Sequence, residues 1–130
     1  MEQNSSLTEP KRGQAANRDS GKDYNVYDDG VLRVEHDNYY VACAGRRVAL
    51  PLKDFLILSR LTKNPERVVT SCELWQHAWG IKKPVNGRTL RVHIHSLRQK
   101  LAPFGINIES MVNVGYRLSV NPAAIDQANG

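Results

Sequence analysis

The strongest constraint on the fold is residues 88–101, whose sequence RTLRVHIHSLRQKL follows a helical period. At ~100° per residue, one side of this stretch collects Leu90, Ile94, Leu97 and Leu101. The opposite side collects Arg88, Val92, His95, Ser96 and Gln99, with Arg91 beside them and Arg98 and Lys100 towards the flanks. The stretch contains no Asp or Glu, whereas a surface helix normally mixes charges. We therefore interpret it as a helix with a core side and a side that faces a polyanion; a solvated amphipathic helix is the alternative.

The composition permits a nucleic-acid partner. The chain has 130 residues, 41% of them hydrophobic, and a formal net charge of +5, which suits one domain with a moderate basic bias. Cys43 and Cys72 have neither metal-site nor disulfide spacing, as expected in a reducing compartment. No apolar run approaches the ~18 to 20 residues of a membrane span, and no export signal is visible. We expect a cytoplasmic protein without membrane association.

Three stretches divide the chain. Residues 1–23 are polar with nearly balanced charges and are expected to be a disordered tail or linker. Residues 24–120 carry the patterning of the single domain, and residues 121–130 are expected to be a flexible C-terminal tail. The domain opens with alternating strand-like residues over 24–50, which predict an antiparallel meander with strands near 26–27, 32–35, 39–44 and 48–50. Such a sheet needs a helix layer on its apolar face.

Two helices are predicted next. Residues 52–62 predict a largely buried helix, because apolar side chains cover most of its circumference. Pro51 suits its start. Thr70 and Glu73 have the spacing of a capping box, which opens a short second helix over residues 71–78.

A third helix and a hairpin complete the domain. Asn86 is expected to cap a helix over residues 87–102. Residues 106–120 predict a β-hairpin in which Asn113 or Gly115 supplies a positive φ. The order of sheet, helix, capped helix, basic helix and hairpin is that of an α+β winged helix-turn-helix, whose third helix is placed to read DNA.

The residues carry this interpretation further. The segments LPLKDFLIL, NPERVVT, ELWQHAWG, VNGRTLRVHIHSLRQKL and GYRL closely resemble the C-terminal effector domain of OmpR/PhoB-type bacterial response regulators, over about residues 26–120. The residues that match in register are Asp54, Phe55, Pro65, Val68, Val69, Trp79, Gly80, Arg88, Thr89, Val92, His93, Ile94, Leu97, Arg98, Lys100, Leu101, Gly115 and Tyr116.

The resemblance implies a DNA-binding transcription regulator of two-component type. It implies binding to direct repeats of double-stranded DNA as a tandem homodimer, with the third helix in the major groove and the hairpin wing near the minor groove. It implies contact with RNA polymerase through the loop of Ile81, Lys82, Lys83, Pro84 and Val85. Family members usually carry a receiver domain ahead of this one. Here only a short polar stretch stands there, so the chain is either a stand-alone domain or a part of a longer protein.

The expected DNA-binding residues are Trp79, Arg88, Thr89, Arg91, Val92, His93, His95, Ser96, Arg98, Gln99, Asn113 and Tyr116. Arg88, beside the amides that open the third helix, suits a phosphate. Arg91 suits O6 and N7 of guanine, and Val92 suits a thymine methyl group. Trp79 can donate its indole N–H to a phosphate or cover the helix junction, and both roles are compatible. We expect Tyr116 to pack its ring under the wing, from where its hydroxyl can also reach a phosphate.

Two positions depart from the resemblance. The family commonly has arginine where this chain has Ser96 and Val112. We therefore expect altered specificity or lower affinity. The same departures motivate the alternative function, a protein-interaction module that keeps the fold.

Other chemistry finds little support. His93 and His95 do not predict a metal site, because residues two apart on a helix point ~200° apart. No nucleophile–base set, carboxylate pair or phosphate loop is present, so we expect neither an enzyme nor a cofactor.

Overall fold

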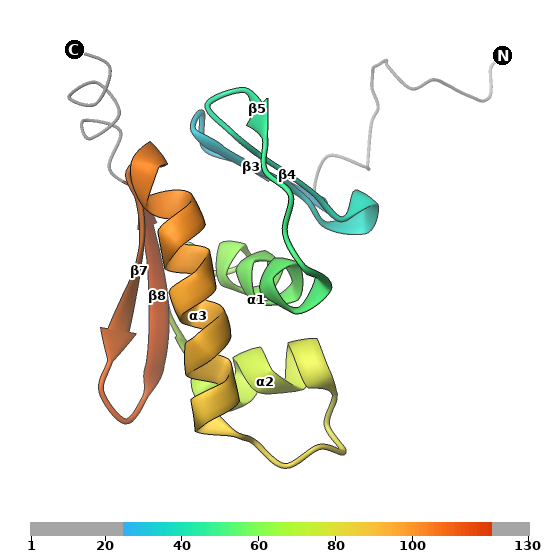
Figure 1. The fold of residues 1–130 in the computed structure, drawn as a ribbon, viewed down its shortest axis with the longest axis vertical. Helices are drawn as coiled ribbons and strands as arrows, with labels where there is room; N and C mark the ends of the chain where they lie inside the picture. Colours follow the sequence, from blue (N-terminus) through green and yellow to red (C-terminus); the bar gives the residue numbers. More distant parts are fainter. Residues whose placement is uncertain (1–24, 121–130) are drawn as a thin grey trace, which may run out of the picture.

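The computed structural model describes residues 25–120, in which a four-stranded sheet, three helices and a hairpin sheet surround one core (Figure 1). The elements are β2 (Val26–Asp28), β3 (Leu32–Glu35), the 3-10 helix η2 (His36–Asn38), β4 (Tyr40–Cys43), β5 (Arg46–Arg47), α1 (Leu52–Thr62), β6 (Val68–Thr70), α2 (Ser71–Trp79), α3 (Gly87–Leu101), the 3-10 helix η3 (Ala102–Phe104), β7 (Ile106–Met111) and β8 (Gly115–Val120). This confirms the predicted α+β winged helix-turn-helix. The expectations for residues 1–23 and 121–130 lie outside the described residues.

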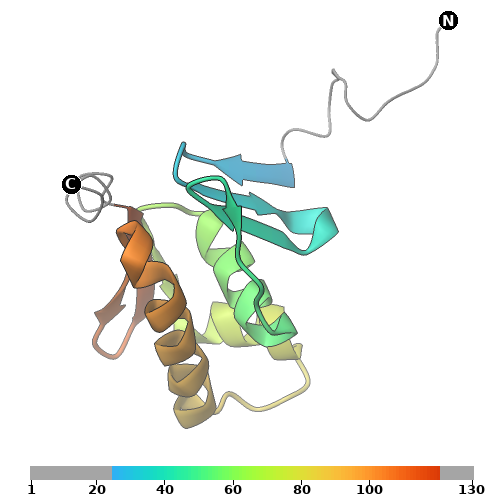
Figure 2. The same cartoon turned by 45° about the horizontal axis from the view of Figure 1, so that its top comes forward.

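The first sheet has the order β2-β3-β4-β5, all antiparallel, and lies against α1 (Figures 1 and 2). Its inward residues, among them Leu32 and Val34, are fully buried. The strand predicted over residues 48–50 is wrong: β5 is the two-residue strand Arg46–Arg47. The tight turn at Ala44 and Gly45, both at positive φ, reverses the chain within two residues. The last strand therefore pairs with β4 at Arg46 and Arg47, ahead of the apolar residues 48–50.

The second sheet has the order β6-β8-β7 and contains a strand that the sequence did not predict. The short β6 pairs with β8, and Val69 lies opposite Tyr116. A Cβ on Gly115 would lie 2.0 Å from the Val69 carbonyl oxygen, so only glycine permits this pairing. The positive φ of the hairpin, 65°, belongs to Asn113. Gly115 is therefore required by close approach between strands and not by the turn.

The helices begin where the capping residues predicted. The Thr70 hydroxyl accepts from the Glu73 N–H and the Glu73 carboxylate accepts from the Thr70 N–H, each at 3.0 Å. The second of these bonds holds the pKa of Glu73 below its usual value. Asn86 caps α3 through its Oδ1, 3.1 Å from the Thr89 N–H. α2 ends one residue later than expected and α3 one residue earlier, before η3.

The core side of α3 is confirmed, since Leu90, Ile94, Leu97 and Leu101 are each at most 1% exposed. Within residues 25–120, no helix combines the length and apolarity needed to cross a bilayer.

A buried acid joins α1 to α3. Asp54 is 1% exposed, its Oδ2 accepts a hydrogen bond from the Ser96 hydroxyl at 2.9 Å, and its Oδ1 lies 2.6 Å from His93 Nδ1. The predicted position of Ser96 on the outward side of the third helix is therefore wrong. Ser96 lies on the flank that faces α1, because the buried carboxylate needs a donor there.

Replacing Gly115 by alanine is expected to destabilise the domain by about 3 kcal/mol, because the added methyl group meets backbone and not a flexible side chain. Urea unfolding followed by circular dichroism measures the change. Gly87→Ala is the control: its Cβ would meet only Arg91 Nη1, at 3.4 Å, and stability should stay within about 0.5 kcal/mol. Equal stabilities of the two variants would contradict the close approach of β6 and β8.

Replacing Ser96 by alanine is expected to cost about 1 to 3 kcal/mol, because Asp54 Oδ2 would remain buried without its donor. The matched control on the same helix is Gln99→Ala, an exposed side chain whose loss should change stability by less than about 0.5 kcal/mol. The same unfolding midpoint for both variants would place Ser96 in solvent.

Candidate nucleic-acid interface

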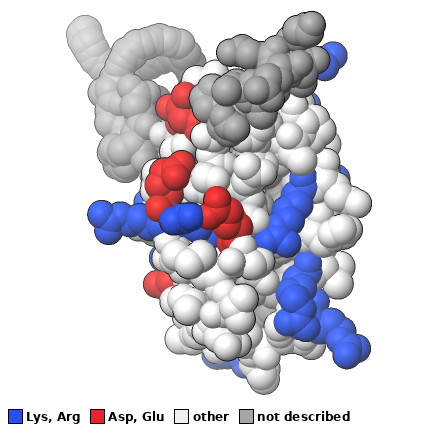
Figure 3. Space-filling model, turned by 90° about the vertical axis from the view of Figure 1, so that its left-hand side faces the viewer, with Lys and Arg blue, Asp and Glu red and all other residues white. Residues whose placement is uncertain are grey.

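The outward side of α3 presents exposed side chains without a single acid. These are Arg88, Arg91, Val92, His95 and Gln99, with Val92 63% exposed. In the described part of the chain, neither Arg88 nor Arg91 forms an ion pair. In Figure 3, Lys and Arg side chains run down the right-hand side of the view, clear of the Asp and Glu side chains, which gather left of centre beside other basic side chains. The two cations are thus free to contact an anion.

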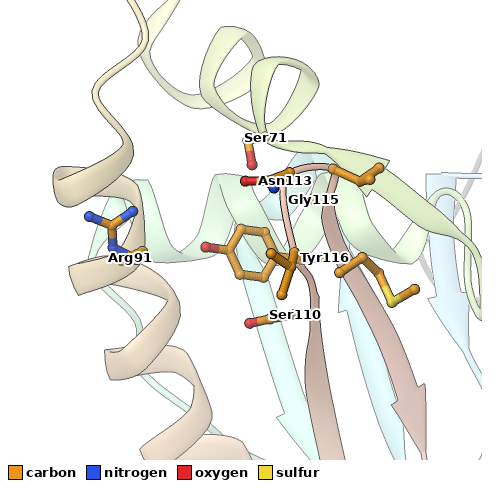
Figure 4. A pocket seen from close by; sticks show the side chains of 9 residues that line it. Ser71, Arg91, Ser110, Asn113, Gly115 and Tyr116 are labelled. Carbon is orange, nitrogen blue, oxygen red and sulfur yellow. The ribbon is translucent and has the colours of Figure 1, made fainter.

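A hollow of about 340 Å³ lies beside this surface, between α3, the start of α2 and the hairpin tip. Figure 4 shows Arg91 on one side and the Tyr116 hydroxyl pointing towards it from the other. Tyr116 is only 8% exposed, and its hydroxyl has no hydrogen-bond partner among residues 25–120. The ring is thus packed under the hairpin, as the sequence suggested, while the hydroxyl faces the hollow beside a cation.

The hairpin tip carries no charge. Val112 is 82% exposed and Val114 is 53% exposed, with Asn113 between them at the apex. Asn113 therefore supplies the polar side chain of the tip.

Arg98 lies away from the outward side. Its Nε donates to the Ile108 carbonyl at 2.8 Å, its Nη2 donates to the Ser110 hydroxyl at 2.7 Å, and its guanidinium lies 6.0 Å from the Tyr116 ring centroid. Arg98 braces the hairpin against α3 and is engaged within the protein. Its flank position was visible in the helical period, but its partners were not.

His93 and Ser96 lie on the opposite flank of α3. Both contact Asp54, and the His93 side chain is 27% exposed. The signal that could have revealed this contact is Asp54 itself, an acid beside Phe55 in a helix that the sequence predicts to be largely buried. His95, by contrast, is exposed on the outward side, so the two histidines do point apart.

Trp79 is half-buried and stacks between other rings. Its ring centroid is 4.1 Å from that of Trp75, at an interplanar angle of 13°, and 5.2 Å from that of His93. Its indole N–H has no partner among the described residues. Trp79 therefore covers the helix junction and still has a free donor. Thr89, also half-buried, lies in the first turn of α3.

The loop between α2 and α3 is exposed throughout. Ile81 is 79% exposed and Val85 is 47% exposed, and Lys82, Lys83 and Pro84 between them are also exposed. One side chain that the sequence did not single out reaches this loop, because Trp75 Nε1 donates to the Lys83 carbonyl at 2.9 Å.

Comparison with known proteins identifies the family. Residues 45–118 match the family described as "Transcriptional regulatory protein, C terminal". The sensory transduction protein RegX3 of Mycolicibacterium smegmatis is 35% identical over 111 residues, which are 83% of this chain and 48% of RegX3. The chain thus spans about half the length of this relative.

Solved structures agree with the family match. The Klebsiella pneumoniae RstA DNA-binding domain, crystallised in complex with the RstA box, is 26% identical with a TM-score of 0.63, covering 72% of this chain and 96% of that domain. DrrB, an OmpR/PhoB homologue of Thermotoga maritima, is 29% identical with a TM-score of 0.61, covering 73% of this chain and 44% of DrrB. The chain belongs to the OmpR/PhoB-type C-terminal DNA-binding domains of response regulators, a family of transcription regulators and not of enzymes.

Proposed function

We propose that this domain binds double-stranded DNA in a sequence-specific way, with α3 in the major groove and the hairpin near the minor groove. The observation that carries the proposal is the outward side of α3, where Arg88 and Arg91 are exposed, unpaired in the described structure and accompanied by no acid on the helix. A cationic helix of this kind fits the width of the major groove. The crystallised complex of the similar RstA domain with its DNA box supports the assignment.

Phosphate contacts and base contacts come from different residues. Arg88 lies in the first turn of α3, where the free amides of the helix also face an anion, so it binds phosphate. The Trp79 indole N–H and the Tyr116 hydroxyl, both without partners in the described structure, are further phosphate donors. These contacts set the position of α3 on the duplex.

Base reading falls to four outward side chains. Arg91 is suited to guanine, Val92 to the thymine methyl group, and His95 and Gln99 to base-edge acceptors and donors further along the groove. Ser96 and Arg98 are engaged inside the protein and take no part in this proposal. A bidentate Arg–guanine pair contributes about 1 to 3 kcal/mol of discrimination, so Arg91 dominates the sequence preference.

The wider assignment extends this proposal. The domain would act in the cytoplasm, as a tandem homodimer on direct repeats. The exposed loop of residues 81–85, with Lys82 and Lys83 between two apolar residues, would contact RNA polymerase. Cations flanked by apolar side chains suit a partner surface with acidic residues.

Replacing Arg88 by alanine is expected to weaken binding about equally for all duplexes, because a phosphate contact carries no sequence information. The slope of log K against log salt concentration should fall in magnitude by about 1. Fluorescence anisotropy across a salt series, on single-site duplexes recovered by selection, measures this slope. Arg46→Ala on β5, which removes the same charge away from α3, should leave the slope unchanged. If wild-type protein bound no duplex at about 50 mM salt, the protein-interaction module would be favoured instead.

Replacing Arg91 by alanine is expected to reduce the affinity for the selected duplex by about tenfold, and to remove most of the preference for guanine at one position. Competition with duplexes that carry each of the four base pairs at that position measures the preference. Gln76→Ala, an exposed substitution on α2, should keep the wild-type preference. A uniform loss across all four duplexes would make Arg91 a phosphate contact and would refute its role in base reading.

A further inference from the structure

The loop of residues 81–85 has a single anchor in the described structure. Residues 80–88 are all exposed, and the capping bonds at Gly80 and Asn86 belong to the flanking helices. Among residues 25–120, one hydrogen bond joins residues 81–85 to the rest of the domain: Trp75 Nε1 donates to the Lys83 carbonyl at 2.9 Å. The donor is 4% exposed, so water competes poorly for this bond.

The same indole ring begins a series of contacts that reaches α3. Trp75 stacks on Trp79 with 4.1 Å between ring centroids, and Trp79 meets the His93 ring edge-on at 5.2 Å. His93 in turn is held by Asp54 of α1. The ammonium of Lys53 lies 5.5 Å from the centroid of the Trp79 ring and donates to the Ala78 carbonyl at 2.8 Å. Trp79 is thus confined on several sides by rings and a cation.

We propose that Trp75 is a positioning residue that couples the loop of residues 81–85 to the DNA-facing surface. It does so through its hydrogen bond to the Lys83 carbonyl and its stack on Trp79. This inference rests on the proposed function, because the signal that it transmits is the arrival of a duplex at Trp79 and α3. The position of this loop on the domain therefore differs between the free and the DNA-bound protein.

The physical basis is close packing. Stacked rings at 4.1 Å cannot slide without losing contact area, so a displacement of Trp79 moves Trp75 as well. Trp79 is half-buried and keeps a free indole N–H, so a duplex can reach it directly. Trp75 is almost fully buried, so a duplex reaches it only through its neighbours. Any response of Trp75 to DNA is therefore transmitted and not direct.

The chain offers a built-in probe for this coupling. It contains two tryptophans, and both belong to the stack. The NMR spectrum of the ¹⁵N-labelled full chain therefore has two indole N–H signals, and Trp75→Phe assigns them by removing one. Phenylalanine keeps an aromatic ring on Trp79 but cannot donate to Lys83. Gln76→Ala, exposed and next in the chain, is the matched control.

The free protein gives the first readout. In Trp75→Phe, the ¹⁵N order parameters of the N–H groups of Ile81, Lys82, Lys83 and Val85 should fall from ~0.85 to below ~0.6, because the carbonyl that anchors the loop has lost its donor. Order parameters of the core strands should be unchanged, and Gln76→Ala should behave as wild type. Unchanged order parameters in the loop would overturn the positioning role of Trp75.

A short duplex recovered by selection gives the second readout. In wild-type protein, the NMR signals of the Trp75 indole and of the amides of Ile81, Lys82, Lys83 and Val85 should change chemical shift as duplex is added. These changes should run in parallel with those of the α3 amides. In Trp75→Phe, the loop response should fall about fivefold while α3 still responds. A full loop response in Trp75→Phe would overturn the coupling. The coupling would also be overturned if, in wild-type protein, the Trp75 indole signal kept its chemical shift while the α3 amides changed theirs. If α3 were silent as well, the proposed DNA function would fail and the coupling with it.

Discussion

The orientation of α3 depends on one buried carboxylate. Asp54 of α1 is almost completely shielded from water, so each of its oxygens needs a donor, and His93 and Ser96 supply them. The core side of α3 alone would tolerate some rotation about the helix axis, because apolar contacts are not directional. The two polar contacts remove that freedom and determine which side chains face outward. The outward position of Arg88 and Arg91 is therefore set, in part, by residues on the other flank.

The periodicity of the sequence was enough to predict α3 and its core side, because a helix with one apolar side buries that side against a core. The caps at Thr70 and Asn86 were equally local and therefore predictable. Ser96 was misplaced because it lies at the border between the flank and the outward side, where only a partner on another helix decides. β6 was missed because three residues form a strand there only when β8 is present to pair with them.

The candidate interface was predictable in part for the same reason. The exposed members of α3 follow from its period, whereas the hollow beside Tyr116 requires the hairpin, the start of α2 and α3 to meet in space. Arg98 is a cation on the basic helix and was therefore expected to contact DNA, but its guanidinium is hydrogen-bonded to the hairpin. Trp75 is a large apolar side chain of the kind found in cores, and its ring is indeed buried. Its one polar atom, however, donates a hydrogen bond to a loop eight residues further along the chain. Side chains with both an apolar body and a polar tip are the ones whose roles a sequence leaves open.

The brace that Arg98 forms between α3 and the hairpin has a consequence for how a complex would form. With the guanidinium held at both Ile108 and Ser110, and β8 locked to β6 at Gly115, the separation of helix and hairpin is set before any encounter. A rigid protein loses little conformational entropy on association, but it cannot adapt its shape. In the proposed complex the adaptation falls on the duplex, so flexible pyrimidine–purine steps would be favoured even at positions that no side chain touches.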